Sequence, residues 1–578
     1  MTKSVIKLMS LVMAVLFTMT IIAGCGSGTN NATDATTAAA GQTQAATTAK
    51  TDFEWEYMED TSPVTIGMWN ANIWPWAKPS AGWDNTETCK LVTQKTGVTL
   101  DIDVQTGKEE DLVGPLIASG DLPETMAFEN YYSPYIQQMI DAGMVLPISD
   151  LIDQYAPKMW NLIPKETVNY HKSKDGKLYK SVAFVGDNES VEAYKSVNYP
   201  PTPGDRVMFI RSDILTAMGK EDIKTTDELY EALKFIKQKY PDVEPFGFSG
   251  DIGADGLGVL LSGSVSNYMP QVFGMHVSKL YSDNGNIKLP NKDPKYLDYM
   301  KFMNKLFKEG LITANGLTEK AQQSDEKEFG AKYGMFVGAV FHVYNTINTT
   351  IEKNTGSKDK IYKAVGPITA PGVEWKAPAL RSWGGKTVII TKNCKEPERM
   401  IKLMEYLFTE EGQTNILLGV EGVTWDMVDG KRVMKPDVVK ELSTSLEEAT
   451  KKYGTISKWV PFAKVEYWAK YIDDYLVPAG PGRDELWKRL GPYVVDHWQE
   501  GFADLQMSIE VGSDTDIVYT KAKEAMTKAA LKLVTAKSDD EFTATYDNSL
   551  KELDALGISK VEDALTAEFK KQLQILGK

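Results

Sequence analysis

Four tryptophans lie close together near the amino end of the chain, in the stretch IGMWNANIWPWAKPSAGW that spans residues 66–83. They are four of the 13 tryptophans in the sequence: Trp69, Trp74, Trp76 and Trp83. The prolines of this stretch lack a backbone donor, and its glycines and asparagines favour turns, so we expect an ordered loop that follows a short strand. Indole rings in such a loop can offer flat apolar faces to a ligand.

Motifs for phosphate binding, nucleophilic catalysis and metal binding are each broken at a residue that the chemistry needs. Gly385, Lys386 and Thr387 end like a phosphate-binding loop, but Leu380 stands in place of its first glycine. In the stretch GFSGD, Asp251 replaces the second glycine of a nucleophile elbow. The 4 histidines are scattered, without an HExxH motif or a Cys/His cluster. We therefore expect no catalytic residue, no metal site and no cofactor.

The composition narrows the range of partners. The formal net charge of −15 disfavours nucleic acid and anionic bilayer surfaces. Beyond Cys25 only Cys89 and Cys394 remain, so at most one disulfide bond can form. Residues 52–578 are too many for one hydrophobic core, which predicts a body of two lobes.

Strand and helix patterns alternate along this body. SPVTIGMW and GVTLDIDV are typical of short strands, and they flank a helix that includes residues 89–96. TMAFEN follows a turn and predicts a third strand. Capping boxes at Thr225, Ser538 and Ser559 predict the starts of later helices, two of them in a mainly helical last third. The pattern indicates an α/β fold.

The first residues predict export. Two lysines and an apolar run over residues 8–22 are typical of a signal peptide, which would occupy residues 1–24. Its end, IIAGC, resembles the bacterial lipobox, in which Cys25 receives a diacylglyceryl group after cleavage. Residues 25–51 carry no aromatic or large aliphatic side chain, so we expect a flexible linker. Acyl chains such as palmitate would anchor the chain stably to a membrane.

Seven separated stretches resemble the family 1 extracellular solute-binding lipoproteins of bacterial ABC importers, specifically the large oligosaccharide-binding type. The stretches are LIASGDLPETMAFEN, KDGKLYKSVAF, VMFIRSDILTAMG, YLDYMKFMNKLFKEGLI, YGMFVG, GGKTVIITKNCKEPERMIKLMEYLFTEEGQ and GVEGVTWDM. Each is weak alone, but their order and spacing agree with the family along nearly the whole mature chain. The resemblance implies a two-lobed, periplasmic-binding-protein-like clamshell of type II, with a ligand bound in the cleft between α/β lobes.

This architecture gives approximate boundaries for the lobes. We expect the first lobe to hold residues 52–181 and 354–395, and the second to hold residues 207–350 and 397–578. The segments between them would form the hinge.

The resemblance also assigns candidate ligand contacts. In the family the loop after the first strand borders the cleft, which makes Trp69, Trp74, Trp76 and Trp83 candidates for stacking on the C–H-rich faces of sugar rings. The other candidates follow strands or precede them at the same cleft: Glu129, Asn130, Tyr131, Tyr132, Phe341, His342, Tyr344, Arg381, Trp383, Trp425 and Asp426. For each of them, packing in a core or at a rim is the alternative.

We therefore predict a monomeric solute-binding component of an ABC importer, lipid-anchored at the outer face of the bacterial cell membrane. It would capture a carbohydrate, most simply an oligosaccharide, and deliver it to the transmembrane permease subunits. A secreted glycoside hydrolase is the enzymatic alternative, because such enzymes share aromatic clefts and need only two carboxylates. A surface adhesin or a peptide-binding lipoprotein is a third hypothesis, which does not explain the clamshell motifs.

Overall fold

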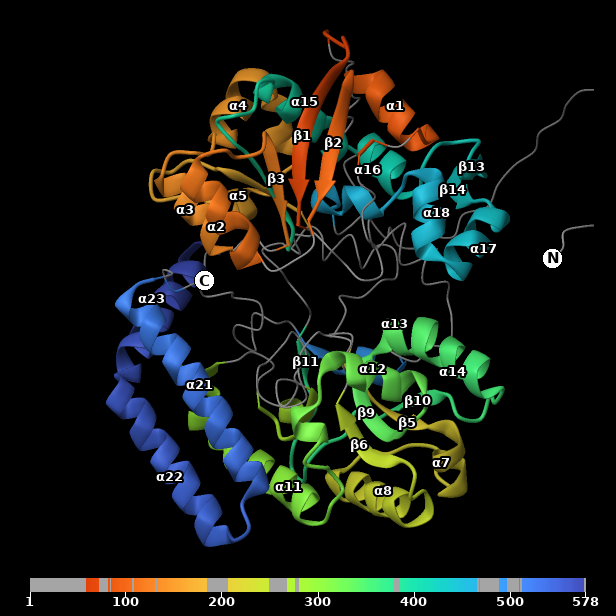
Figure 1. The fold of residues 1–578 in the computed structure, drawn as a ribbon, viewed down its shortest axis with the longest axis vertical. Helices are drawn as coiled ribbons and strands as arrows, with labels where there is room; N and C mark the ends of the chain where they lie inside the picture. Colours follow the sequence, from red (N-terminus) through yellow and green to blue (C-terminus); the bar gives the residue numbers. More distant parts are fainter. Residues whose placement is uncertain are drawn as a thin grey trace, which may run out of the picture. The chain divides into compact units, whose positions relative to one another are not determined.

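The computed structural model describes residues 59–71, 82–83, 85–105, 109–129, 133–183, 206–248, 268–275, 280–378, 385–464, 467, 488–495, 509 and 512–575. Their strands form two main sheets, each at the centre of a lobe, together with three two-stranded ribbons (Figure 1). The predicted signal peptide, Cys25 and the linker lie outside the described residues. None of the helices in the described part is both long enough and apolar enough to cross a membrane.

The sheet of the first lobe has five strands in the order β2-β1-β3-β12-β4. Their bounds are β1 (Val64–Asn70), β2 (Val98–Val104), β3 (Thr125–Phe128), β4 (Lys180–Val182) and β12 (Thr387–Ile390). β1 pairs in parallel with β2 and β3, whereas β12 runs antiparallel to β3 and β4. The three strands predicted from the sequence are thus confirmed, and Figure 1 shows their arrowheads pointing the same way.

Both faces of this sheet are covered, as the alternation of side chains along β1 illustrates. Met68 points to one core, which also holds residues of α1, α4, α15 and α16. Trp69 points to the opposite core, with residues of α2 and α3. Neighbouring residues of a strand face opposite sides, so one short strand contributes to both cores. The helices of the first lobe are α1 (Glu87–Thr96), α2 (Glu109–Ser119), α3 (Pro134–Asp141), α4 (Ile148–Tyr155), α5 (Lys165–His171), α15 (Pro397–Phe408), α16 (Glu410–Leu417), α17 (Pro436–Thr444) and α18 (Leu446–Tyr453).

The segment from α15 to a 3-10 helix at Ser457–Phe462 belongs to the first lobe, whereas we expected residues 397–578 in the second. Its buried side chains, among them Met404 and Trp459, share a core with Met68. β10 (Tyr362–Val365) departs from the expected boundary in the opposite sense, because it pairs with β5 of the second sheet. Burial of apolar side chains explains both positions: α15 covers one face of the first sheet, and β10 buries Tyr362, Ala364 and Val365 in the core of the second lobe.

The sheet of the second lobe has the order β10-β5-β9-β6. Its further strands are β5 (Arg206–Arg211), β6 (Glu244–Phe248) and β9 (Tyr333–Ala339). β9 is buried along its whole length and pairs antiparallel with β5 and in parallel with β6. The helices around this sheet are α7 (Ser212–Ala217), α8 (Thr226–Lys239), α10 (Tyr268–Val272), α11 (Tyr296–Lys308), α12 (Ala321–Phe329), α13 (Val340–His342) and α14 (Asn348–Thr355). Thr225 caps α8 as predicted, because its hydroxyl accepts a hydrogen bond from the Glu228 backbone N–H at 3.2 Å.

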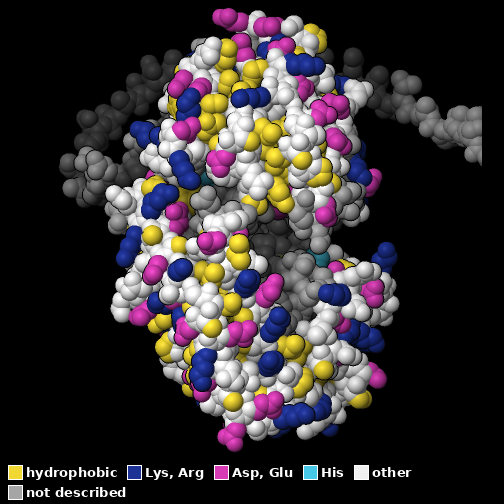
Figure 2. Space-filling model, turned by 60° about the vertical axis from the view of Figure 1, so that its left-hand side comes forward, with side chains coloured by type: hydrophobic (Ala, Val, Ile, Leu, Met, Phe, Trp, Pro, Cys, Tyr) yellow, Lys and Arg dark blue, Asp and Glu magenta, His cyan; other side chains and the backbone are white. Residues whose placement is uncertain are grey.

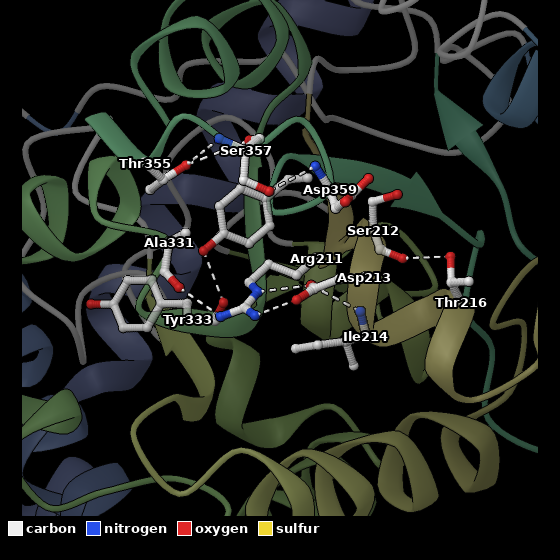
Figure 3. A network of polar contacts seen from close by, with 11 residues as sticks. Arg211, Ser212, Asp213, Ile214, Thr216, Ala331, Tyr333, Thr355, Ser357 and Asp359 are labelled. Atoms are coloured by element: carbon white, nitrogen blue, oxygen red, sulfur yellow. Dashed lines mark hydrogen bonds and ion pairs between the residues drawn. The ribbon is translucent and has the colours of Figure 1, made fainter. Parts of the chain in front are cut away.

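A buried arginine organises one end of the second sheet (Figure 3). Arg211 ends β5 and is only 5% exposed. Its guanidinium donates to both carboxylate oxygens of Asp213, at 3.0 and 2.5 Å, and to the Ala331 carbonyl at 3.0 Å. Since Ala331 lies just before β9, the arginine joins the end of one central strand to the start of its neighbour.

Three long helices form the carboxyl end of the chain: α21 (Asp514–Thr535), α22 (Asp539–Leu556) and α23 (Ile558–Ile575). α21 and α22 lie side by side, and α21 packs on α11 (Figure 1). Asn304 of α11 donates hydrogen bonds to the carbonyls of Val534 and Ala536, at 2.9 and 2.8 Å. At the other end of the group, Gln572 of α23 donates to the hydroxyl of Tyr170 in α5 at 3.4 Å. The carboxyl-terminal helices therefore contact both lobes.

The predicted capping box at Ser559 is wrong. α23 begins at Ile558, so Ser559 already lies inside the helix. Its partner Glu562 is buried and accepts from Lys288 and Lys292, each with 3.0 Å between nitrogen and oxygen. A tertiary ion pair therefore uses the carboxylate that a local cap would need. Lys288 lies in the ribbon of β7 (Tyr281–Asp283) and β8 (Asn286–Lys288).

Two further ribbons complete the described strands. They are β11 (Ala377–Pro378) with β15 (Val494–Val495), and β13 (Trp425–Val428) with β14 (Lys431–Met434). Acidic and basic side chains are interspersed over the face drawn in Figure 2. On this face the net charge is therefore not concentrated into a surface of one sign.

Candidate ligand-binding site

The carboxyl ends of β1, β2 and β3 meet at one edge of the first sheet, which we call the carboxyl edge. The backbone continues the sheet past the strand ends, because the Ala71 N–H donates to the Ala127 carbonyl at 3.0 Å. The Gln105 N–H likewise donates to the Asn70 carbonyl at 2.9 Å. In open α/β sheets, ligands bind outside the carboxyl ends of the strands, so this edge is the first place to seek a site.

The tryptophan-rich segment is held at this edge by both of its described ends. It leaves the sheet at Ala71, directly after β1. It returns at Gly82, whose N–H donates to the Ile102 carbonyl of β2 at 2.8 Å. Trp74 and Trp76 lie between these two points and outside the described residues. The described ends fix where the segment begins and stops, close to the ends of two parallel strands.

The first and last of the four tryptophans pack inside the lobe. Trp69 is 4% exposed, with its ring 5.4 Å from that of Phe128. Trp83 is partly buried; its indole N–H donates to the Thr93 hydroxyl at 3.1 Å, and its ring lies edge-on to Trp459 at 5.5 Å. Both rings bind the segment to the lobe, and their contact with a ligand stays a prediction.

Trp425 and Asp426 belong to the β13–β14 ribbon. The Trp425 ring is 5% exposed, and its N–H donates to the Gly419 carbonyl at 2.9 Å. Asp426 is exposed, with its carboxylate 3.7 Å from the Lys435 ammonium. The burial of Trp425 gives it a packing role in the first lobe, whereas Asp426 faces solvent on the ribbon.

Glu129 lies directly after β3, at the carboxyl edge. Its carboxylate forms an ion pair with the ammonium group of Lys386, the residue before β12. The Lys386 side chain is only 5% exposed, whereas that of Glu129 is 38% exposed. Burial lowers the pKa of Lys386, and the adjacent carboxylate of Glu129 opposes this shift. The next three candidates, Asn130, Tyr131 and Tyr132, lie outside the described residues.

Lys386 is a candidate that our sequence interpretation missed, because GGKT was considered only as a failed phosphate loop. The usable signal is its place before a strand that pairs antiparallel with β3. In that register Thr387 lies opposite Phe128. Because the strands are antiparallel, Lys386, which precedes Thr387, lies beside Glu129, which follows Phe128. Lys180 of β4 is a second lysine of this sheet whose pKa burial lowers, here to about 8.

The candidates of the second lobe follow β9 directly. Phe341 and His342 lie in α13, and Tyr344 lies in a π-helix at Val343–Ile347. The His342 ring lies 6.3 Å from the Phe329 ring at a steep angle. The Tyr344 hydroxyl accepts from the Ala364 backbone N–H at 3.3 Å, so this side chain is held against the sheet. π-Helical turns are frequent at functional sites, which agrees with a binding role here.

Arg381 and Trp383 lie outside the described residues. Within the described ranges, no group of three or more His, Cys, Asp or Glu side chains suits a metal ion.

A hollow of about 840 Å³ lies beside the amino end of β3 and is also lined by residues of β1 and β2. Trp69 and Gly67 form part of its wall. Its polar lining is mainly acidic and consists of Asp101, Asp103, Ser119, Asp121, Glu124, Asn393 and Lys395. Glu124 already accepts two backbone N–H groups, from Gly67 at 2.8 Å and from Lys395 at 3.1 Å. This carboxylate is therefore used to join β1 to the chain that follows β12.

The sequence matches the family described as bacterial extracellular solute-binding protein over residues 90–414, more than half of the chain. The chain therefore belongs to this family. Its members bind solutes and are not enzymes, so the chain is a solute-binding protein.

Individual relatives share only a low sequence identity with this chain. The lipoprotein LipO of Bacillus subtilis (strain 168) is 22% identical over 366 residues, which cover 62% of this chain and 67% of LipO. The polygalacturonan/rhamnogalacturonan-binding protein YtcQ of the same organism is 23% identical over 368 residues, with the same shares of each chain.

Among solved structures, alginate-binding protein AlgQ2 has a TM-score of 0.63 at 22% identity, covering 88% of this chain and 98% of AlgQ2. Streptococcus pneumoniae FusA bound to kestose has a TM-score of 0.63 at 16% identity, covering 88% of this chain and 100% of FusA. These likenesses show the fold: a two-lobed, periplasmic-binding-protein-like α/β clamshell, as predicted.

Proposed function

We propose that this chain is the ligand-capturing component of an ABC importer and that its ligand is an oligosaccharide. The observation that carries the proposal is the anchoring of both described ends of the tryptophan-rich segment at the carboxyl edge, next to Glu129. Trp74 and Trp76 would stack on sugar rings, and Glu129 would accept hydrogen bonds from hydroxyl groups. Relatives named for polygalacturonan and for fructo-oligosaccharides support a carbohydrate.

The ligand would bind between the lobes and favour their closure. A sugar that touches the carboxyl edge of the first lobe and the α13 region of the second stabilises the closed form by the contacts made only there. A permease would then receive sugar from the closed, loaded monomer. Transport would draw its energy from an ATPase on the other side of the membrane.

A binding survey tests this proposal. The body Glu54–Lys578 forms one compact unit and suits calorimetry together with intrinsic tryptophan fluorescence. We expect saturable binding of at least one intact plant or host oligosaccharide, with weaker binding of monosaccharides and none of peptides. Binding of peptides alone, or cleavage of the sugar, would contradict the proposal.

We further propose that Cys25 carries the lipid and that residues 25–51 tether the body to the outer face of the cell membrane. The lipobox-like sequence and the relative named as a lipoprotein support this. In cells fed a labelled fatty acid, the protein should take up the label and Cys25→Ala should abolish it. A label that persists in the Cys25→Ala variant would contradict the lipid attachment.

The body without residues 1–51 should keep its ligand affinity unchanged, because the tether takes no part in the site.

A further inference from the structure

We propose that the β13–β14 ribbon contacts the membrane and rests in the headgroup region of the bilayer that holds the lipid of the tether. The contact is made by four apolar side chains, Val423, Met427, Val428 and Val433, which we call the ribbon surface. The inference rests on the proposed lipid attachment at Cys25. It adds a second contact between the body and the membrane, apart from the sugar site.

Exposed apolar side chains gather on this ribbon. Of the six large hydrophobic side chains that are exposed in the described part of the chain, four lie between residues 423 and 433. These four form the ribbon surface, and each is 40–48% exposed. Single exposed apolar residues are common on any protein, whereas a group of neighbours marks an interaction site.

The ribbon is rooted in the first lobe, and its far end is exposed on both faces. At its base Trp425 lies opposite Met434, and both are buried in the core of the lobe. Farther out, Met427 lies on the same face as Trp425, whereas Val428 and Val433 lie on the other. A flat protein surface covers one face of a ribbon, but a soft headgroup layer can surround both.

The tether reaches the lobe at the end of α1. Arg399 joins the first described residues to this helix, because its guanidinium lies 3.2 Å from the Asp60 carboxylate and donates to the Thr96 carbonyl at 2.9 Å. Asp60 itself is largely exposed. The root of the tether is therefore at the surface, beside the last residue of α1.

A short run of ion pairs leads from there to the ribbon. Lys95, in the last turn of α1, pairs with Glu411 at the start of α16. The neighbouring Glu410 accepts a hydrogen bond from Arg432 of β14 at 2.9 Å. The ribbon thus lies next to α16, close to the root of the tether (Figure 1). A lipid at the other end of the tether would keep this part of the lobe near the bilayer.

The ribbon is neutral, although the chain carries a formal net charge of −15. Residues 421–435 contain three acidic and three basic side chains: Glu421, Asp426, Asp429, Lys431, Arg432 and Lys435. An anionic surface repels the chain as a whole, so apolar contact with uncharged lipid headgroups is the attraction that this ribbon can offer. The stem of Lys431 can lie along the apolar layer while its ammonium stays in water.

The tether makes a weak contact sufficient. As a flexible coil, residues 25–51 would have a root-mean-square length of about 30 Å. The body would then face the membrane at an effective concentration in the millimolar range. A few apolar side chains, too few to hold a free protein at a bilayer, can keep a tethered one in a preferred orientation.

A fluorescent label on the ribbon tests the inference. The mature lipid-anchored protein with Val428→Cys is labelled with the environment-sensitive dye NBD and placed in phosphatidylcholine vesicles that contain nitroxide lipids. Cys89 and Cys394 are buried and Cys25 would carry the lipid, so only the new thiol is open to the dye. The matched control is Ile517→Cys, which is equally exposed but lies on α21.

We expect the nitroxide lipids to quench the label at residue 428 at least about threefold more strongly than the label at residue 517, because shallow insertion brings the ribbon to the lipids. Adding Met427→Gln and Val433→Thr to the Val428→Cys protein should reduce the quenching to the level of the control. Both added side chains are exposed, so the melting temperature should stay the same.

Three outcomes would overturn the inference. The first is equal quenching of the two labels. The second is quenching at residue 428 that persists when Met427 and Val433 are polar. The third is shielding of the label that grows with the density of the protein and is independent of nitroxide lipid, which would assign the ribbon surface to a second copy of the chain.

Sugar binding, measured in the same vesicles, separates this inference from the proposed function. Normal sugar affinity without contact of the ribbon leaves the importer proposal intact. A chain that takes up no fatty acid lacks the tether and overturns the inference together with the lipid attachment, which the fatty-acid label reveals before the protein is placed in vesicles.

Discussion

Replacement of both Trp74 and Trp76 by alanine is expected to weaken oligosaccharide binding about 10- to 100-fold. Each aromatic contact contributes about 0.5–1.5 kcal/mol beyond the apolar area that it buries, and the two losses act on one ligand. Melting should stay at the wild-type temperature, because Trp69 and Trp83 are the rings that pack the ends of the segment into the lobe.

Calorimetry on the wild type and the double variant measures this effect, with melting followed by circular dichroism. Trp160→Phe is the matched control, since this indole belongs to a 3-10 helix at Pro157–Asn161 and its N–H donates to Asp153 at 2.8 Å. It should leave affinity unchanged. A double variant that melts early yet binds normally would mean that Trp74 and Trp76 only fasten the segment.

Arg211→Met should lower the free energy of unfolding by about 3 kcal/mol. This is the largest loss of stability that we expect from a single substitution. The arginine is buried and serves Asp213 and the Ala331 carbonyl together (Figure 3). Removal of one partner of a buried pair leaves the other charge uncompensated, which costs about 3–5 kcal/mol, and the partial exposure of Asp213 reduces this.

Urea denaturation followed by tryptophan fluorescence would measure the loss. Lys90→Met provides the comparison, because its pair with Glu87 is exposed and should contribute less than about 1 kcal/mol. Equal effects of the two substitutions would show that the network at the end of β5 adds nothing beyond a surface pair. Ligand affinity of the folded Arg211 variant should be normal, because Ala331 and α13 lie at opposite ends of β9.

Local structure was predictable wherever neighbouring residues decide it. The alternation in VTIGMWN predicts β1, and the Asn284-Gly285 and Asp429-Gly430 pairs turn the chain in two ribbons at positive φ, as such dipeptides favour. The cap at Thr225 also formed, because it depends on residues three apart. The predicted cap at Ser559 did not form, because Lys288 and Lys292, which are far away in the sequence, form ion pairs with Glu562.

The site was predictable only in outline. A tryptophan-rich loop after the first strand points to the carboxyl edge, but sequence cannot say which ring is buried, since that depends on α2 and α3 covering one face of the sheet. Lys386 escaped notice for the same reason. Its pairing with Glu129 exists only through the antiparallel register of β12 and β3, which are distant in sequence. The limits of the lobes were likewise set by long-range packing, as α15 shows.

The positions of the strands of the two sheets along the sequence affect the order in which the lobes can fold after export. The second sheet takes its strands from one continuous stretch, Arg206–Val365, whereas the first takes β1 to β4 early and waits for β12 at Thr387–Ile390. When the chain emerges amino end first, the first sheet therefore stays incomplete until β12 appears. All four strands of the second sheet are available before that point. Until α15 and α16 follow, only α1 and α4 cover the face that holds Met68, so part of its apolar surface stays exposed and this interval favours aggregation.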